Sequence, residues 1–260
     1  MIWEFAKTGY QSAMAVPDRI YRHRIIFHHV PKCGGSSVTT PLRLRSLLSY
    51  RKIDEDAVQR VAFCEGHAGY VSRHEEAFRQ KRGLVLYEAE SGTRLIQSHV
   101  PWFPAEASSA AASYDRVTVI RHPVDRFVSH YFFDRKQDNL NTISREIGDF
   151  LQTDQARCFA THLTRYFSGR QWPYEVGKEP VEAAIAGIGE FSIVGILEDL
   201  PKFKRDILRR YGWSIRIPKT NEGARDRNLP DALMEEIREL CASDLMLYEM
   251  ISQTRRSTEL

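Results

Sequence analysis

The chain has 260 residues, of which 42% are hydrophobic and 27% charged, a composition typical of a globular protein with a full hydrophobic core. The formal net charge of +3 is too small to indicate nucleic-acid binding. The four cysteines form no CxxC pair, so neither a zinc site nor a redox motif is indicated for Cys33, Cys64, Cys158 and Cys241.

Residues 1–22 form a mixed leader ahead of a single domain that we expect over residues 23–255. The leader lacks the charged segment and apolar core of a signal peptide. No apolar run approaches the roughly 20 residues needed to span a bilayer, so we expect no transmembrane segment. Scattered single cysteines are typical of a reducing compartment, which predicts a cytoplasmic protein.

Strands and helices alternate along the chain. Short apolar runs predict strands at residues 24–30, 94–98, 116–120 and 191–196. Helical patterns are expected from Leu42 to Leu48, from Pro123 past Tyr131, and at residues 143–167, 202–211 and 233–251. Residues 54–82 are charged and either helical or irregular, and residues 213–229 are irregular. This alternation predicts an α/β domain with a mainly parallel sheet, whose ligands bind beyond the carboxyl ends of the strands.

The first chemical motif follows the strand at 24–30 and reads HHVPKCGGSS, from His28 to Ser37. Gly34 and Gly35 allow the backbone to curl so that successive N–H groups converge on one point. Ser36 and Ser37 add hydroxyl donors at the start of a helix, and Lys32 adds a mobile positive charge beside them. This loop, Cys33 included, is a predicted phosphate-binding cradle. The alternative is a plain glycine turn beside a solvated lysine.

The second motif, RVTVIRHPVDRFVSHY, begins at Arg116 and ends at Tyr131. Arg121 stands at the carboxyl end of the predicted strand, and Ser129 follows about two helical turns later, so both can face one ligand. An arginine fork and a serine hydroxyl suit a terminal phosphate. The alternative is that Arg121 pairs with a carboxylate such as Asp125 while Ser129 only packs.

Two phosphate sites at neighbouring strand ends imply a ligand with phosphates at two places. Both motifs resemble those of the sulfotransferases that use 3'-phosphoadenosine 5'-phosphosulfate (PAPS), especially the branch with carbohydrate sulfotransferases and many bacterial homologues. Residues 29–37 resemble that family's His-x-Pro-Lys-x-Gly-Gly-Ser/Thr-Ser/Thr loop for the 5'-phosphosulfate. Residues 121–129 resemble its Arg-x-Pro-x-x-Arg-hydrophobic-x-Ser segment for the 3'-phosphate.

The resemblance extends over about residues 24–250. Three downstream segments share family patterns: TRYFSG at 164–169, VGILE at 194–198 and DLMLY at 244–248. Cys33 stands where threonine is common and His122 where aspartate is common, and neither position is needed for phosphate contact. Residues 54–92 match no family segment that we can name, so they are candidates for shaping the acceptor site.

The resemblance implies a P-loop-like nucleotide-binding sulfotransferase fold, PAPS as sulfuryl donor, no metal, and a hydroxyl acceptor for which a carbohydrate is the first choice. It implies a bacterial protein and no nucleic-acid partner. Lys32 is the candidate for stabilising the leaving oxygen. Arg225 or Arg227, in the loop at 219–227, would close over the nucleotide, unless that loop is simply a solvated surface segment.

The general base is expected to be a histidine, whose ordinary pKa of about 6.5 suits proton transfer near neutrality. His99 is favoured because QSHVP resembles the family's Gly-His-x-Pro segment and lies at a suitable spacing from the second motif. His67, in EGHAG, is the rival, and Glu65 remains a further candidate.

Two other functions fit parts of this pattern. A P-loop kinase or nucleotidase needs a lysine after the last glycine and a strand-end carboxylate for magnesium. Here Lys32 precedes both glycines, and the nearest carboxylate, Asp199, follows the wrong strand. A nucleotide-binding protein without transferase activity is the second alternative.

Overall fold

The computed structural model describes residues 23–46, 49–104, 109–170, 177–218 and 229–257. One sheet of five parallel strands lies at its centre, in the order β2-β3-β1-β4-β5. The strands are β1 (Ile25–His28), β2 (Tyr50–Lys52), β3 (Leu95–Ser98), β4 (Asp115–Ile120) and β5 (Ile193–Ile196). The prediction of a single α/β domain with a parallel sheet is confirmed.

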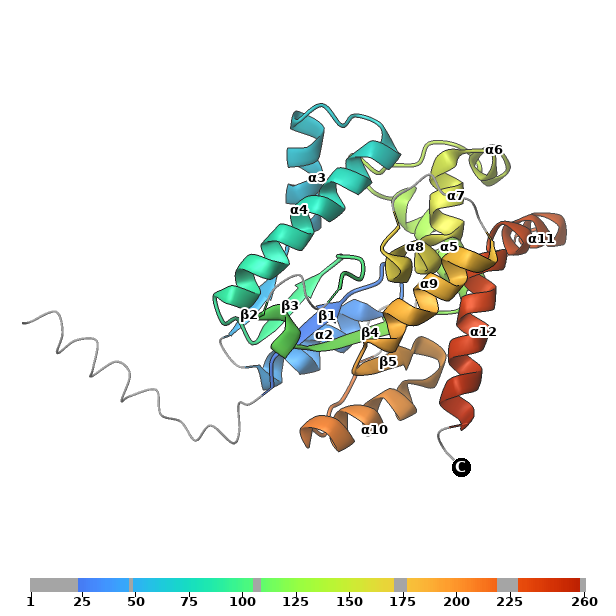
Figure 1. Ribbon diagram of the computed structural model, residues 1–260. Coiled ribbons are helices and arrows are strands. Elements are labelled where there is room, and N and C mark those ends of the chain that lie inside the picture. The colour runs from blue at the N-terminus through green and yellow to red at the C-terminus, as the bar shows by residue number, and fades with distance from the viewer. Residues whose placement is uncertain (1–22, 47–48, 105–108, 171–176, 219–228, 258–260) are drawn as a thin grey trace, which may run out of the picture.

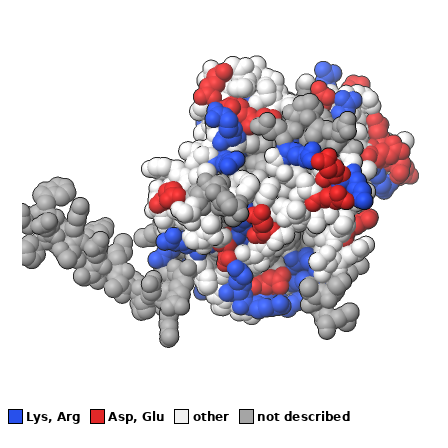
Figure 2. Space-filling view, viewed as in Figure 1, with Lys and Arg blue, Asp and Glu red and all other residues white. Residues whose placement is uncertain are grey.

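Helices flank the sheet (Figure 1). They are α2 (Gly35–Arg45), α3 (Glu55–Cys64), α4 (Tyr70–Glu90), α5 (Pro123–Asp134), α6 (Ile147–Leu151), α7 (Asp154–Ala160), α8 (His162–Ser168), α9 (Lys178–Gly189), α10 (Leu200–Tyr211), α11 (Asp231–Leu240) and α12 (Ala242–Ser257). Two short 3-10 helices span Ala111–Ser113 and Leu197–Asp199. Figure 2 shows basic and acidic side chains interspersed on one face of the molecule.

The alternation of side chains along each strand builds two cores, one on each face of the sheet. Ile25 and Phe27 of β1 pack with α2 and α10. Ile26, between them in sequence, packs on the opposite face with Val85 and Ala89 of α4. Figure 1 shows α4 and α10 on opposite sides of the strands. A further apolar cluster, formed with α8, α9 and α12, lies at the carboxyl ends of β1, β4 and β5.

Several predicted elements differ from the structure. The helix expected at 143–167 is three helices, because the Thr153 hydroxyl accepts the Ala156 N–H at 3.1 Å and starts α7, and a buried carboxylate starts α8. The last helix divides into α11 and α12 at Cys241. Strand β2 and helix α9 were not predicted. The expected stop of α10 is confirmed, since Gly212 has a left-handed φ of 70°.

Candidate active site

The two phosphate motifs leave neighbouring strands at the same edge of the sheet. Strands β1 and β4 pair in parallel, with His28 opposite Thr118, and the Thr118 hydroxyl donates to the His28 carbonyl at 2.8 Å. The loop that follows β1 therefore meets the segment that follows β4. Burial raises the pKa of the Cys33 thiol to about 12, while the nearby cations of Arg126 and Arg121 oppose this rise. The structure thus brings the segments 31–37 and 121–129 together.

The loop after β1 owes its path to two residues with left-handed backbone. Lys32 has a φ of 66° and Gly34 a φ of 74°, after which α2 begins at Gly35. The N–H groups of Ser37 and Val38 both donate to the Gly34 carbonyl, at 3.1 and 3.3 Å. The N-cap residue is Gly34, which has no side chain that could cap the helix. The start of a helix offers backbone N–H groups that suit an anion.

Both glycines are also required by packing. A Cβ atom on Gly34 would lie 2.6 Å from Leu197 Cδ1. A Cβ atom on Gly35 would lie 1.9 Å from His29 Cδ2. The phosphate loop therefore rests directly on two neighbouring side chains, and any larger residue at either position must displace them.

Helix α5 contacts the first motif and carries part of the second. The Lys32 ammonium lies 3.5 Å from the centroid of the Phe133 ring, in a cation–π contact with this helix. The same helix carries Ser129, which is 8% exposed, and it begins two residues after the half-buried Arg121. Lysine, arginine and serine therefore gather around the start and one side of α5.

The segments at 194–198 and 244–248 support the second motif. Glu198 accepts hydrogen bonds from the His122 N–H at 3.0 Å and from the Tyr248 hydroxyl at 3.1 Å. The His122 ring packs edge-on against Tyr248, with ring centroids 5.5 Å apart. This arrangement holds the chain that enters α5, and so helps to position Arg121.

Asp244 holds the segment at 164–169. Its buried carboxylate accepts the N–H groups of Leu163 and Thr164, both at 2.8 Å, and so caps the first turn of α8. Burial raises the pKa of Asp244 to about 6, against the opposing effect of Arg126 and the two N–H donors. Sequence reasoning noticed this aspartate in a family pattern but assigned it no role.

His99 lies at the same sheet edge as the phosphate loop. It follows β3, which pairs with β1, and its ring centroid is 4.3 Å from that of His29. Gln97 holds the His29 ring by an amide N–H to Nδ1 hydrogen bond of 3.0 Å. Burial, with positive charge on Lys81 and Lys52, lowers the pKa of His99 to about 3. The imidazole is therefore neutral at physiological pH.

The rival candidates lie elsewhere. His67 stands in the turn between α3 and α4, on the wall of a separate pocket. Glu65 is exposed and accepts a hydrogen bond from the Gln80 amide at 2.7 Å. Arg225 and Arg227 fall outside the described residues. Asp199 caps α10 by accepting the Lys202 N–H at 3.2 Å.

Two ion pairs that join α4 to other helices could not be predicted from the sequence. Lys81 is fully buried and pairs with Glu55 at 2.8 Å, and Arg165 pairs with Glu75 at 3.1 Å. The Phe78 ring lies beside both cations, 4.5 Å from the Lys81 ammonium and 4.8 Å from the Arg165 guanidinium. Each pair joins residues of different helices, so no local spacing signals it.

Asp134, at the end of α5, is a further buried acid near the lysine of the loop. It is 4% exposed, and one of its carboxylate oxygens lies 3.6 Å from His130 Nε2. Burial raises the pKa of Asp134 to about 7, although the charge of Lys32 lowers it in part.

Within the described parts of the chain, no group of three or more His, Cys, Asp or Glu side chains is arranged to hold a metal ion. None of their helices has both the length and the apolar character needed to cross a bilayer.

A parallel sheet with a glycine-containing loop that leads from β1 into a helix, and with an arginine after the adjacent β4, is an arrangement typical of nucleotide-binding α/β proteins. The model of the Sulfotransferase family matches residues 19–259, and the chain belongs to that family of transferases. The crystal structure of a sulfotransferase from Alicyclobacillus acidocaldarius has a similar fold, with a TM-score of 0.51 and 16% identity over 88% of this chain and 95% of that one. The comparison with curated proteins found no significant match.

Proposed function

We propose that the protein transfers the sulfuryl group of PAPS to a hydroxyl group of an acceptor. A carbohydrate is our first choice for that acceptor. The observation that carries the proposal is that the segments 31–37 and 121–129, each expected to bind a phosphate, meet at adjacent ends of β1 and β4. A doubly phosphorylated adenosine carries two separate phosphate groups, so each of the two segments can bind one of them. Membership of the sulfotransferase family supports the same donor.

In this proposal the chain holds PAPS by its two ends. The backbone N–H groups and hydroxyls from Gly34 to Ser37 bind the 5'-phosphate at the start of α2, and Cys33 contributes its backbone in this loop. Arg121 and Ser129 bind the 3'-phosphate. Lys32, beside the loop, stabilises the negative charge that develops on the leaving phosphate oxygen.

The reaction itself is an in-line displacement. The acceptor oxygen forms a bond to sulfur while the bond from sulfur to the bridging oxygen breaks, and the nucleotide leaves as 3'-phosphoadenosine 5'-phosphate (PAP). The hydroxyl proton passes to a general base. Positioning of the two reactants and stabilisation of charge supply most of the rate, as in phosphoryl transfer, and no step requires a metal.

His99 is the proposed base. Its neutral imidazole can accept a proton, and it lies beside the His29 ring against which the phosphate loop packs. A pKa of about 3 makes it a weak base in the nucleotide-free protein. The negative phosphosulfate would raise this pKa on binding, since an opposite charge favours the protonated form. His67, which lines a pocket beside the turn between α3 and α4, is the alternative base to be tested.

The acceptor class rests on the resemblance to the carbohydrate branch, and a location in the bacterial cytoplasm is proposed with it. The test is incubation of the protein and a fractionated extract with PAPS labelled in its sulfuryl group. Label should enter an acceptor with the wild type and not with Lys32→Ala, although that variant should keep the wild-type circular dichroism spectrum. Equal labelling by the two proteins would contradict the role of Lys32.

A further inference from the structure

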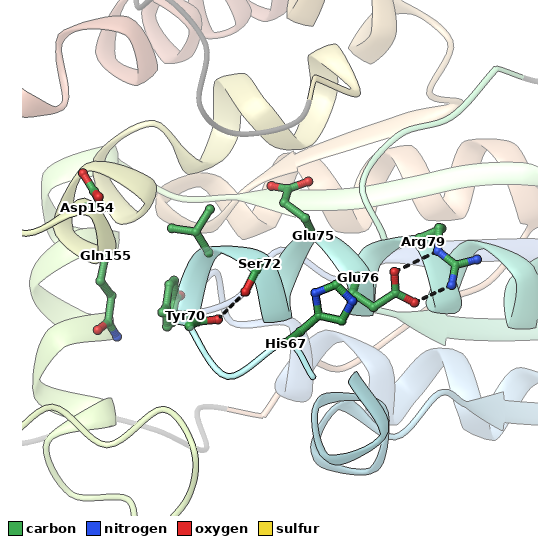
Figure 3. A pocket seen from close by; sticks show the side chains of 10 residues that line it. His67, Tyr70, Ser72, Glu75, Glu76, Arg79, Asp154 and Gln155 are labelled. Carbon is green, nitrogen blue, oxygen red and sulfur yellow. Dashed lines mark hydrogen bonds and ion pairs between the residues drawn. The ribbon is translucent and has the colours of Figure 1, made fainter. Parts of the chain in front are cut away.

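A pocket of about 710 Å³ lies beside the turn between α3 and α4. Its volume is within the range of small-molecule sites and suits one or two sugar rings. Figure 3 shows Asp154 and Gln155 of α7 on one side and His67, Glu76 and Arg79 on the other, with Tyr70 and Ser72 between them. Most of the side chains that line it carry a polar or charged group, and Tyr70 and Val71 are its largely apolar members. The phosphate-binding segments do not line it.

Each carboxylate of this pocket pairs with an arginine. Glu76 accepts hydrogen bonds from Nε and Nη2 of Arg79, the first of them at 2.9 Å (Figure 3). Glu75 is paired from beneath with the buried Arg165 at 3.1 Å. Asp154 pairs with Arg157 at 2.9 Å. Of these pairs, only the one between Glu75 and Arg165 is buried. The lining holds three carboxylates, which can accept hydrogen bonds from hydroxyl groups, against the single guanidinium of Arg79, so its charge disfavours an anionic ligand.

Two further features suit a hydroxylated ring. Gln155 on the pocket wall is partly exposed and carries an amide with both a donor and an acceptor, and its nitrogen is buried with no hydrogen-bond partner among the described residues. Tyr70 adds an aromatic side chain to the wall, and one face of its ring is covered by His74, with centroids 3.9 Å apart. Carboxylates, an amide and an aromatic ring together can satisfy the polar edge and the apolar face of a sugar.

The pocket is connected to the candidate reaction centre through fixed contacts. Glu75, on its wall, pairs with Arg165 of α8. The next residue, Tyr166, donates its hydroxyl to the His29 carbonyl at 3.3 Å. The His29 ring packs against Gly35 of the phosphate loop. These contacts fix the wall of the pocket relative to the loop after β1.

We propose that this pocket binds an uncharged, polyhydroxylated part of the acceptor, away from the hydroxyl that receives the sulfuryl group. The inference rests on the proposed function and narrows the acceptor to neutral saccharides, in contrast to polyanionic ones. Binding at such a remote subsite positions the reacting hydroxyl for in-line attack.

The first test separates acceptors by charge. Water-soluble glycans from cells that make the protein are passed over an anion exchanger, and the retained and unretained fractions are incubated separately with labelled PAPS. Label is expected in the unretained, uncharged fraction. Label confined to the retained fraction overturns the inference but leaves the transfer reaction standing. Label in neither fraction contradicts a soluble carbohydrate acceptor, and the inference falls with it.

The second test uses matched variants on the labelled fraction. Asp154→Lys and Gln155→Leu are expected to raise KM for the acceptor about five- to tenfold, the effect of one lost hydrogen bond, with kcat and PAP affinity unchanged. Glu235→Lys is the control, because Glu235 pairs with Arg238 as Asp154 pairs with Arg157 and is similarly exposed, 62% against 67%. Wild-type KM in both pocket variants would overturn the inference.

Discussion

Replacement of Gly35 by alanine should damage both the stability of the protein and its nucleotide site. The new Cβ would lie 1.9 Å from His29 Cδ2 and 2.2 Å from His29 Nε2, whereas non-bonded carbon atoms prefer about 3.5–4.0 Å. The His29 ring has little room to retreat, because Gln97 holds it by a 3.0 Å hydrogen bond and His99 packs beside it. Overpacking of this kind costs roughly 1–3 kcal/mol of unfolding free energy.

This loss should appear as a lower melting temperature in differential scanning calorimetry. For a domain of this size, 1 kcal/mol corresponds to about 2–4 °C, so the expected decrease for Gly35→Ala is roughly 2–12 °C. PAP affinity, measured by titration calorimetry, should fall as well, because the loop moves together with the first turn of α2.

Gly83→Ala is the matched control for this substitution. Gly83 lies within α4, and a Cβ atom there would meet no other atom within 4 Å. The change should therefore stabilise the helix by up to about 1 kcal/mol and leave PAP binding unchanged. A Gly35→Ala protein with wild-type melting temperature and PAP affinity would refute the packing argument.

Three further predictions follow from the site and its buried groups. Arg121→Ala should weaken PAP binding at least tenfold, or about 1.4 kcal/mol, in titration calorimetry. His99→Ala should lower the transfer rate with little loss of PAP affinity, and His67→Ala should not. Urea unfolding should need less denaturant as pH falls below about 6.5, because His28 and His74 are buried with pKa values lowered to about 3 and take up protons on unfolding. Each of these two histidines should cost about 2 kcal/mol at pH 5.

Controls and contrary outcomes are available for each. Arg51→Ala changes an arginine whose side chain is 61% exposed and should keep wild-type PAP affinity; equal affinity in Arg121→Ala would count against the 3'-phosphate assignment. A rate loss in His67→Ala alone would make His67 the base. Asp134 and Asp244, whose pKa values are raised, hold protons in the folded state and oppose the acid effect. A urea midpoint that rises on acidification would show that these carboxyls dominate.

The arrangement of the phosphate segments was predictable because it depends on local rules. The glycines and the lysine at 32–35 indicate a turn, and an apolar strand precedes each motif. In a parallel sheet, strand ends of this kind meet at one edge. The structure pairs β1 directly with β4, so residues 90 positions apart come together, as at the 2.8 Å contact between Thr118 and His28.

Other features depend on contacts that the sequence does not announce. Strand β2 is only Tyr50–Lys52, partly exposed and at the edge of the sheet, so it lacks the apolar signal of a strand. The start of α8 is set by the carboxylate of Asp244, some 80 residues later in the chain. From the sequence, a lysine such as Lys81 would be expected at the surface. In the structure it is buried and paired with Glu55 of another helix. Tertiary partners decide all three.

Comparison of PAP with adenosine 5'-monophosphate in titration calorimetry tests the central claim most directly. The two ligands differ only in the 3'-phosphate, which the segment at 121–129 is proposed to bind while the loop at 31–37 holds the 5'-phosphate. We expect one PAP per chain and an affinity at least tenfold above that of the monophosphate, or about 1.4 kcal/mol. Equal affinities, or no binding of PAP, would contradict a site built for two phosphates.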